Sequence, residues 1–257
     1  MPSLLRIVTA SLLAGAIALP AAACSSGGPG TSSAAPAAGT PDQIVQQAVS
    51  DLKAATSLRI SGSVVSQGTN IMIDFTDAAA HGCRGSLALA ASASSSGASS
   101  SGAAVSGAAV SGAANLVEVN STVYMELDKS FFENLGLPSS AFSEVTGKYI
   151  KVTSTSELAN FAQLCDPSTL ASGFDKEVTG FVKDGTATID GQATEAFKQP
   201  KHAGSGVVYI SRSATPEIVQ LQGPGSEGQV NFTNYNAPAT ITAPPAADVI
   251  DGSKFGL

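Results

Sequence analysis

The chain has 257 residues, with 13 basic and 20 acidic side chains and a formal net charge of −7. An acidic balance of this size argues against nucleic acid as a partner and against docking on anionic lipid through a basic surface. The three cysteines and two histidines form no CxxC, HExxH or clustered Cys/His pattern that would indicate zinc. We therefore expect neither a bound metal nor a cofactor.

Residues 1–23 have the layout of an export signal. Arg6 supplies the only early charge, an aliphatic run follows it, and small residues end the run directly before Cys24. We interpret this segment as a cleaved signal peptide. A transmembrane anchor is the alternative, since about 17 to 25 apolar residues would span a bilayer. Pro20 and the three alanines before Cys24 favour cleavage.

The run of small residues that ends in Cys24 resembles the lipobox of bacterial lipoproteins, although Ala21 stands where leucine is usual. In that class the cysteine thiol receives a diacylglycerol and the signal is cut before it. The resemblance implies that Cys24 is the lipid attachment site, which would anchor the chain to the extracytoplasmic face of the cell membrane. An ordinary signal peptide that leaves a free thiol is the alternative.

Residues 24–40 are predicted to form a flexible tether. After Cys24 they consist of Ser, Gly, Ala, Pro and Thr, with no charge and no large apolar side chain to bury. The remainder, residues 41–257, has the length of one large domain. A signal, a tether and a folded domain are thus the expected organisation.

The domain begins with a helix and continues mainly as strands. Thr40-Pro41-Asp42-Gln43 is a capping box, and the apolar residues that follow recur at helical spacing through about residue 56. From Leu58 the apolar period becomes two, with turns expected at 67–69 and 77–82. Strands follow from residues 58, 71 and 83, and at 116–119, 123–127, 149–152, 177–182, 186–189, 195–198, 207–211, 217–221 and 229–235. This pattern predicts an α+β fold with a strongly curved antiparallel sheet.

Helical signals interrupt the strands once, at residues 154–165, where Ser154 to Glu157 open an apolar stripe that ends in Cys165. If Cys24 carries the anchor, Cys83 and Cys165 are the remaining pair, and an exported protein favours a disulfide between them. That bond would fix the helix to the third strand. Two separate buried thiols are the alternative.

Residues 90–114 are nearly all Ser, Ala and Gly and include the tandem "VSGAAVSGAA". A segment with so little to bury is predicted to be a disordered insert at a hairpin tip. A glycosylated or partner-binding loop is the functional alternative.

Signals for catalysis are weak. His81 and His202 lie in glycine-containing turn sequences, and no GxSxG nucleophile elbow is present. Residues 223–228 match GxGxxG, but they precede a strand instead of opening a helix, which indicates a turn. Asp74, Asp190 and Asp248 have no spacing typical of an acid/base pair. We expect that the protein is not an enzyme.

The order of the motifs in residues 42–251 resembles actinobacterial lipoproteins of the LppX/LprG/LprA type, which share a half-barrel fold with the LolA and LolB carriers. After the lipobox, tether and first helix, the motifs are "SLRISGSV", "IMIDF", "GCRGSLAL", "VNSTVYMEL", "GKYIKV", "IDGQATEAF", "VVYISRSATPEIVQL" and "VNFTNYNAPATITAPPAADVID". The resemblance implies a half-barrel sheet wrapped around a few helices, with an apolar cavity for lipid or glycolipid acyl chains. The Ser/Ala/Gly insert departs from this pattern.

The implied function is that of a membrane-anchored, non-catalytic carrier or sensor of lipids in the cell envelope. A structural or adaptor lipoprotein with the same fold and no lipid-sized cavity is the alternative. The implied partners are a lipid or glycolipid ligand and the membrane, and an envelope transporter is a further candidate. Eight strand residues are candidates for the cavity lining, each with plain core packing as its alternative: Ile71, Ile73, Phe75, Val117, Val119, Val123, Met125 and Leu127.

Overall fold

The computed structural model describes residues 38–66, 69–78, 82–91, 110–137, 141–153, 156, 158–159, 165–168, 171, 179–201, 206–255 and 257. The predicted signal peptide, Cys24, most of the tether and both histidines lie outside these ranges. Most of the helix predicted at 154–165 also lies outside them. No helix within the described ranges is long and apolar enough to cross a membrane.

The first helix, α1 (Pro41–Ala54), begins where the capping box predicts. The Gln43 backbone N–H donates to Thr40 Oγ1 at 3.3 Å, and the Thr40 backbone N–H donates to Gln43 Oε1 at 2.9 Å. These bonds satisfy N–H groups that the helix itself leaves without partners. The apolar stripe of α1 is buried, with Val45 and Leu52 fully inaccessible. The helix is therefore fixed by its cap and by packing.

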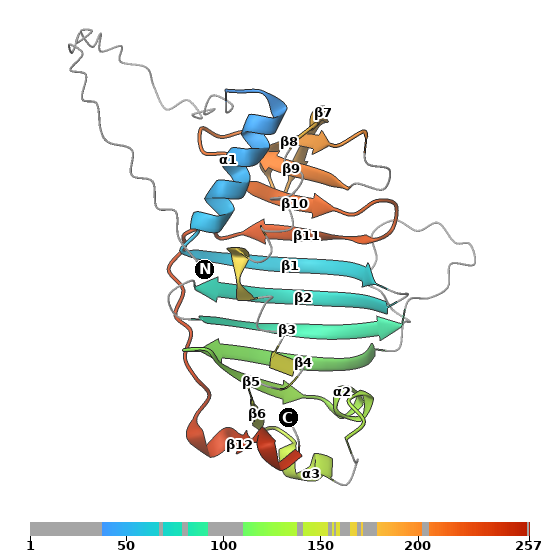
Figure 1. Ribbon diagram of the computed structural model, residues 1–257, viewed down its shortest axis with the longest axis vertical. Coiled ribbons are helices and arrows are strands. Elements are labelled where there is room, and N and C mark those ends of the chain that lie inside the picture. Colours follow the sequence, from blue (N-terminus) through green and yellow to red (C-terminus); the bar gives the residue numbers. More distant parts are fainter. Residues whose placement is uncertain are drawn as a thin grey trace, which may run out of the picture. The chain divides into compact units, whose positions relative to one another are not determined.

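One twelve-stranded sheet makes up most of the domain (Figure 1). The order across it is β12-β6-β5-β4-β3-β2-β1-β11-β10-β9-β8-β7, and every pairing is antiparallel except that of β12 with β6. The strands are β1 (Ser57–Ser66), β2 (Thr69–Ala78), β3 (Gly82–Ala91), β4 (Val110–Val119), β5 (Thr122–Leu127), β6 (Tyr149–Val152), β7 (Val182–Ile189), β8 (Gln192–Lys198), β9 (Val207–Ser211), β10 (Ile218–Gln222), β11 (Gly228–Thr233) and β12 (Val249–Asp251). The fold is thus mostly β, and the strong curvature of the sheet stays a prediction.

Several predicted boundaries are corrected. Strands β3 and β4 reach residues 91 and 110, so the strands take up both ends of the insert predicted at 90–114, and residues 92–109 lie outside the described ranges. Strand β2 extends through Asp77 and Ala78, which the sequence places in a turn. Residues 179–181 are not strand, and β7 runs unbroken from 182 to 189. Strand pairing with β3 and β8 extends these strands beyond their apolar cores.

Two short helices, α2 (Lys129–Asn134) and α3 (Phe142–Val145), are not predicted from the sequence. Asp128 caps α2, because its carboxylate accepts a hydrogen bond from the Phe131 backbone N–H at 2.6 Å. The same carboxylate accepts from the Ala113 N–H of β4 at 2.8 Å. Helices of six and four residues are too short to show a 3.6-residue period, so the sequence carries no clear signal for them.

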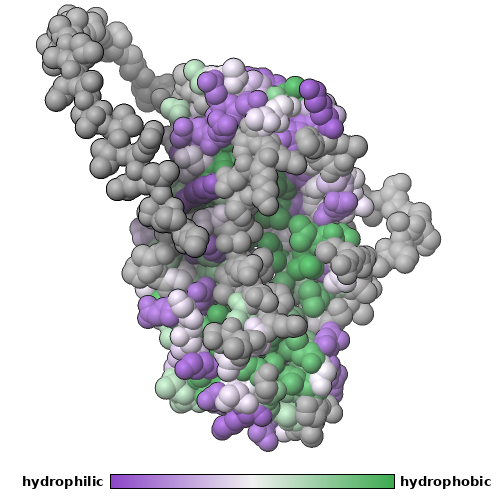
Figure 2. All heavy atoms as spheres, in the orientation of Figure 1, coloured by the Kyte–Doolittle hydropathy of each residue, from purple (hydrophilic) through white to green (hydrophobic). Residues whose placement is uncertain are grey.

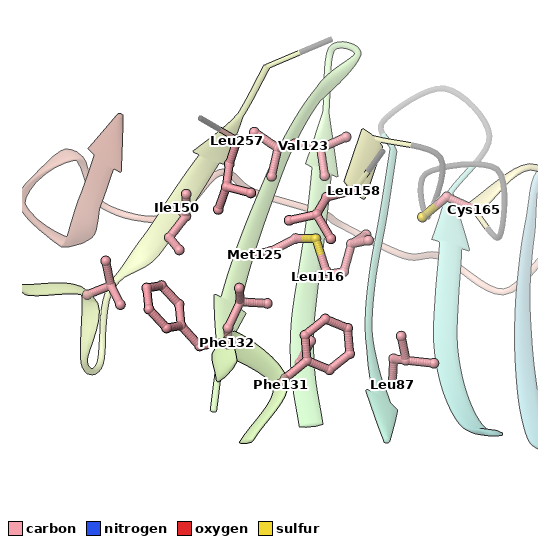
Figure 3. Close-up of a cluster of buried hydrophobic side chains, with 14 of the residues drawn as sticks. Leu87, Leu116, Val123, Met125, Phe131, Phe132, Ile150, Leu158, Cys165 and Leu257 are labelled. Atoms are coloured by element: carbon pink, nitrogen blue, oxygen red, sulfur yellow. The ribbon is translucent and has the colours of Figure 1, made fainter. Parts of the chain in front are cut away.

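The buried side chains lie in three clusters. We call the face of the sheet that carries α1 and α2 the covered face. One cluster on it, drawn in Figure 3, joins β2–β6 to α2 and includes Leu116, Met125 and Phe132. A second joins α1 to β1 and β8–β11. The third and smallest packs the chain around Ile241 on Ala78 and Val117 of the opposite face.

Candidate functional site

A continuous row of apolar side chains crosses the covered face. Directly paired residues of neighbouring antiparallel strands share a face, so the register defines the row. We call it the central row; from β8 to β5 its members are Phe197, Val208, Leu221, Val230, Gly62, Ile73, Leu87, Ala114 and Leu127. Apart from Gly62, every position is a hydrophobic side chain. A stripe across nine strands is longer than either buried cluster on this face.

The central row is buried at both ends and half-buried in the middle. Phe197 and Leu87 are at most 2% exposed, whereas Leu221, Val230 and Ile73 are only partly covered. Ile73 packs against both clusters of the covered face and so marks the boundary between them. Figure 2 shows hydrophobic residues gathered on this face, toward the right-hand ends of the central strands. The middle of the row is therefore incompletely covered apolar surface.

A pocket of about 430 Å³ adjoins this middle part. Its apolar lining comes from β1, β9, β10 and β11 and from the segment before β7: Val64, Val65, Phe181, Val207, Val208, Leu221 and Val230. Gln199 and Glu227 are among its few polar side chains. The size and the mainly apolar lining with a few polar groups are typical of pockets that bind small molecules. The pocket and the central row together are the candidate functional site.

The GxGxxG motif forms one wall of this pocket as a turn between β10 and β11, as the sequence predicts. The Gly223 backbone N–H donates to the Gly228 carbonyl at 2.9 Å. Gly228 has a φ of +102°, and a Cβ there would lie 2.1 Å from the Ser63 carbonyl oxygen of β1. Only glycine allows this approach of the turn to β1.

The structure divides the eight predicted lining residues between two faces. Six belong to or pack against the cluster of Figure 3: Phe75, Val123, Met125 and Leu127 are buried, and Ile71 and Ile73 are half-buried. Val117 and Val119 belong with Ile241 on the opposite face, a correction to their predicted grouping. None of the eight lines the 430 Å³ pocket. Ile73 and Leu127, in the central row, are the two predicted residues that lie within the candidate site.

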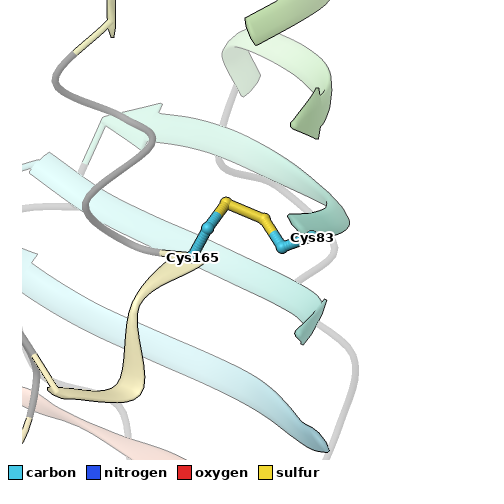
Figure 4. Close-up of a disulfide and its surroundings, with 2 residues drawn as sticks. All are labelled: Cys83 and Cys165. Atoms are coloured by element: carbon cyan, nitrogen blue, oxygen red, sulfur yellow. A yellow bond between two sulfur atoms is a disulfide. The ribbon is translucent and has the colours of Figure 1, made fainter. Parts of the chain in front are cut away.

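A second row of directly paired residues on the covered face contains two acids and a cysteine. Asp77, Cys83 and Glu118 are direct partners on β2, β3 and β4. The predicted disulfide joins Cys83 to Cys165, with a Cα–Cα distance of 5.4 Å (Figure 4). It attaches the chain around Cys165 to β3, on the same face as the Figure 3 cluster.

Burial raises the pKa of both carboxyl groups in this row, Asp77 and Glu118. Asp77 is 2% exposed, and its Oδ2 atom has no hydrogen-bond partner. Burial, followed by the charges of Asp166 and Glu118, raises the pKa of Asp77 to about 7. Burial and the charge of Asp166 also raise the pKa of Glu118. Neither acid is among the residues predicted from the sequence: Asp77 falls in a predicted turn, and Glu118 is a single acid in a predicted apolar strand.

Two further pockets are more polar. One of about 620 Å³ lies between α1 and residues 214–216 and is lined by Gln43, Gln47 and Asp51 among others. Another of about 660 Å³ lies over the opposite face of the sheet, where Arg59 donates two hydrogen bonds to Asp74 at 2.7 and 2.9 Å. Neither offers a continuous apolar lining.

The acids that the sequence analysis considers for catalysis lie apart. Asp74 pairs with Arg59, Asp248 pairs with Lys148 at 3.1 Å, and Asp190 lies in the β7–β8 turn. An acid/base pair needs two carboxyl groups a few ångströms apart across a substrate. These three residues belong to separate parts of the fold and do not form such a pair.

No protein-family model matches the sequence, and no curated protein matches it. Among solved structures, LprF from Mycobacterium bovis matches with a TM-score of 0.48 and 16% identity, covering 80% of this chain and 99% of LprF. The lipoprotein LppX from Mycobacterium tuberculosis matches with a TM-score of 0.44 and 13% identity, covering 78% of this chain and 97% of LppX. Structural similarity to LppX-type lipoproteins, which the motif order predicts, thus extends over about four-fifths of the chain.

Proposed function

We propose that the protein is a membrane-anchored lipoprotein that binds lipid or glycolipid acyl chains on the covered face of its sheet, without catalysis. The observation that carries the proposal is the central row, whose half-buried middle adjoins an apolar pocket of about 430 Å³. Curvature of the sheet around this face would deepen the site. Cys24 would carry the lipid anchor on the extracytoplasmic side of the membrane.

The dimensions of the row suit a long hydrocarbon chain. Neighbouring strands lie about 4.8 Å apart, so the five strands from β9 to β2 span about 19 Å. An acyl chain lying across them would contact Val208, Leu221, Val230 and Ile73 in succession. Each methylene removed from water contributes about 0.8 kcal/mol, so ten would contribute about 8 kcal/mol. The hydrophobic effect alone then supports binding, before the costs of association.

The charge of the pocket lining indicates which part of a lipid would enter the pocket. Basic side chains are absent from the described residues that line it. An anionic headgroup would find no cation there and would stay in water. The pocket therefore favours the acyl chain itself, with the headgroup at the rim.

The test compares two valines of nearly equal exposure, Val64 in the pocket at 36% and Val182 on the edge strand β7 at 39%. Val64→Asp would place a carboxylate against the acyl chain and is expected to weaken uptake of a fluorescent fatty acid at least tenfold, about 1.4 kcal/mol. Val182→Asp is expected to leave uptake unchanged. Native mass spectrometry of the purified protein would report any lipid that copurifies.

Equal uptake by the two variants would contradict binding in this pocket. Wild-type protein that carries no lipid and takes up no fatty acid would refute the carrier role. The hypothesis of a structural or adaptor lipoprotein would then remain. Circular dichroism of both variants would show whether the sheet is intact, so a folding defect is separated from a binding defect.

A further inference from the structure

The disulfide lies within a cluster of metal-ligating atom types. Cys83 on β3 is directly paired with Glu118 on β4. Cys165 lies outside the sheet and is joined to Cys83 by the disulfide (Figure 4). The two Sγ atoms and a Glu118 carboxylate oxygen all lie within 4.8 Å of one another. Cys83 is fully buried and Cys165 is 6% exposed. Three donors from three separate parts of the chain thus converge at one point.

Asp77 is a buried acid next to the cluster, on the other side of Cys83 from Glu118. It is the direct partner of Cys83 on β2, so both side chains lie on the covered face. Asp77 is only 2% exposed, and its Oδ2 atom has no hydrogen-bond partner. Of the ion pairs formed within the described ranges, none includes Asp77 or Glu118. A buried carboxylate oxygen without a partner is costly, and a cation bound beside Cys83 would offset its charge.

We propose that reduction of the Cys83–Cys165 disulfide turns this cluster into a binding site for a thiophilic divalent cation of the Zn²⁺ class. Two thiolates and the Glu118 carboxylate are three ligands, and water would fill a fourth position. Sulfur and carboxylate donors in a four-coordinate arrangement are typical of Zn²⁺, whereas Ca²⁺ and Mg²⁺ prefer oxygen alone. The site is independent of the lipid pocket, which lies on other strands.

The chemistry balances in two steps. A phosphine and one water reduce the disulfide, which yields two thiols and the phosphine oxide. The cation then replaces the two thiol protons, so each metal bound releases two protons. The positive charge of the metal offsets the negative charge that two thiolates and a buried carboxylate bring together.

The experiment titrates the full chain with Co²⁺, which reports thiolate ligation by its absorption, after reduction with a water-soluble phosphine. Reduced wild-type protein is expected to bind one Co²⁺ with sulfur-to-metal absorption that Zn²⁺ displaces, and the oxidised protein is expected to lack that absorption. Glu118→Gln removes a direct ligand and is expected to weaken binding at least about 10- to 100-fold, the loss typical of removing even an outer-shell partner of a metal ligand. Glu126→Gln, on β5, is the matched control and is expected to bind as the wild type does.

Absence of a thiolate absorption in the reduced protein would overturn the proposal. So would equal Co²⁺ affinity in wild type and Glu118→Gln, because an unfolded dithiol would bind without that carboxylate. If reduction alone unfolds the domain, Zn²⁺ is expected to restore its circular dichroism, since binding to a folded site stabilises the fold. Failure to restore the spectrum would equally refute the proposal.

Discussion

Replacing both disulfide cysteines with alanine is expected to lower the free energy of unfolding by about 4.5 kcal/mol. The bond joins residues that are 82 positions apart. In the chain-entropy model, closing a loop of that length removes about 15 cal/mol/K from the unfolded chain, which is about 4.5 kcal/mol at 25 °C. The variant Cys83→Ala/Cys165→Ala restores that entropy and leaves the paired strands β2–β4 in place.

Urea denaturation followed by circular dichroism would measure this loss. The double variant should unfold at a lower urea concentration, and metal-free wild type reduced by a phosphine should unfold close to it. Oxidised wild type is the reference for both. A loss below about 1 kcal/mol would refute the reasoning, because it would mean that the disulfide does not restrict the unfolded chain as the model requires. A larger loss in the alanine variant than in the reduced protein would measure the packing of the sulfur atoms.

Three further outcomes are expected. Because the pKa of Asp77 is about 7 in the fold and near 4 when unfolded, its protonated form is favoured in the folded protein. Wild-type stability should therefore fall relative to Asp77→Asn between pH 4 and 7, by at most about 4 kcal/mol; parallel pH profiles from urea unfolding would contradict this. Cys24→Ser should move the protein from the membrane to the soluble fraction, whereas retention with an uncut signal would favour a transmembrane anchor. Gly228→Ala should destabilise more than Gly225→Ala by thermal unfolding. Both glycines have positive φ, but only at Gly228 would the new Cβ lie 2.1 Å from a backbone oxygen; equal losses would contradict a close approach of the turn to β1.

Local signals predict the start of the domain well. Thr40 and Gln43 are adjacent enough in sequence for the capping box to be read directly, and the buried stripe of α1 follows from the spacing of Val45, Val49 and Leu52. The β10–β11 turn follows in the same way from its glycines. These features depend on contacts between residues only a few positions apart.

Strand periodicity alone does not determine which side chains of β4 and β5 point to which face of the sheet. Alternation correctly separates Val117 and Val119 from Leu116, but it does not say which set faces the helices. The two-residue turn at Asn120-Ser121 pairs Leu116 with Met125 and Val117 with Tyr124. Val117 therefore lies on the other face of the sheet from Met125. The turn length together with the two-residue period would have been enough to predict this.

The pocket could not be predicted because its strands meet only in the folded chain. Strand β1 pairs with β11 across more than 160 residues, as in Gly62 with Val230. No period within either strand identifies the other as its neighbour. The row of Asp77, Cys83 and Glu118 was missed for a related reason: strand pairing carries Asp77 past the point where apolar alternation ends.

The width of the sheet gives a physical reason for a binding surface on its covered face. Twelve strands at about 4.8 Å make about 53 Å, whereas α1, with 14 residues, is about 21 Å long and about 10 Å wide. Helix α2 adds less than two turns, over β4. Two clusters form where these helices pack, and the central row runs from one to the other. In its middle, Val230 and Leu221 pack against the edge of the α1 cluster and stay half-buried. Apolar surface in that position is costly in water. A hydrocarbon ligand would remove that cost through shape and hydrophobicity alone, so binding an acyl chain there requires no catalytic residue.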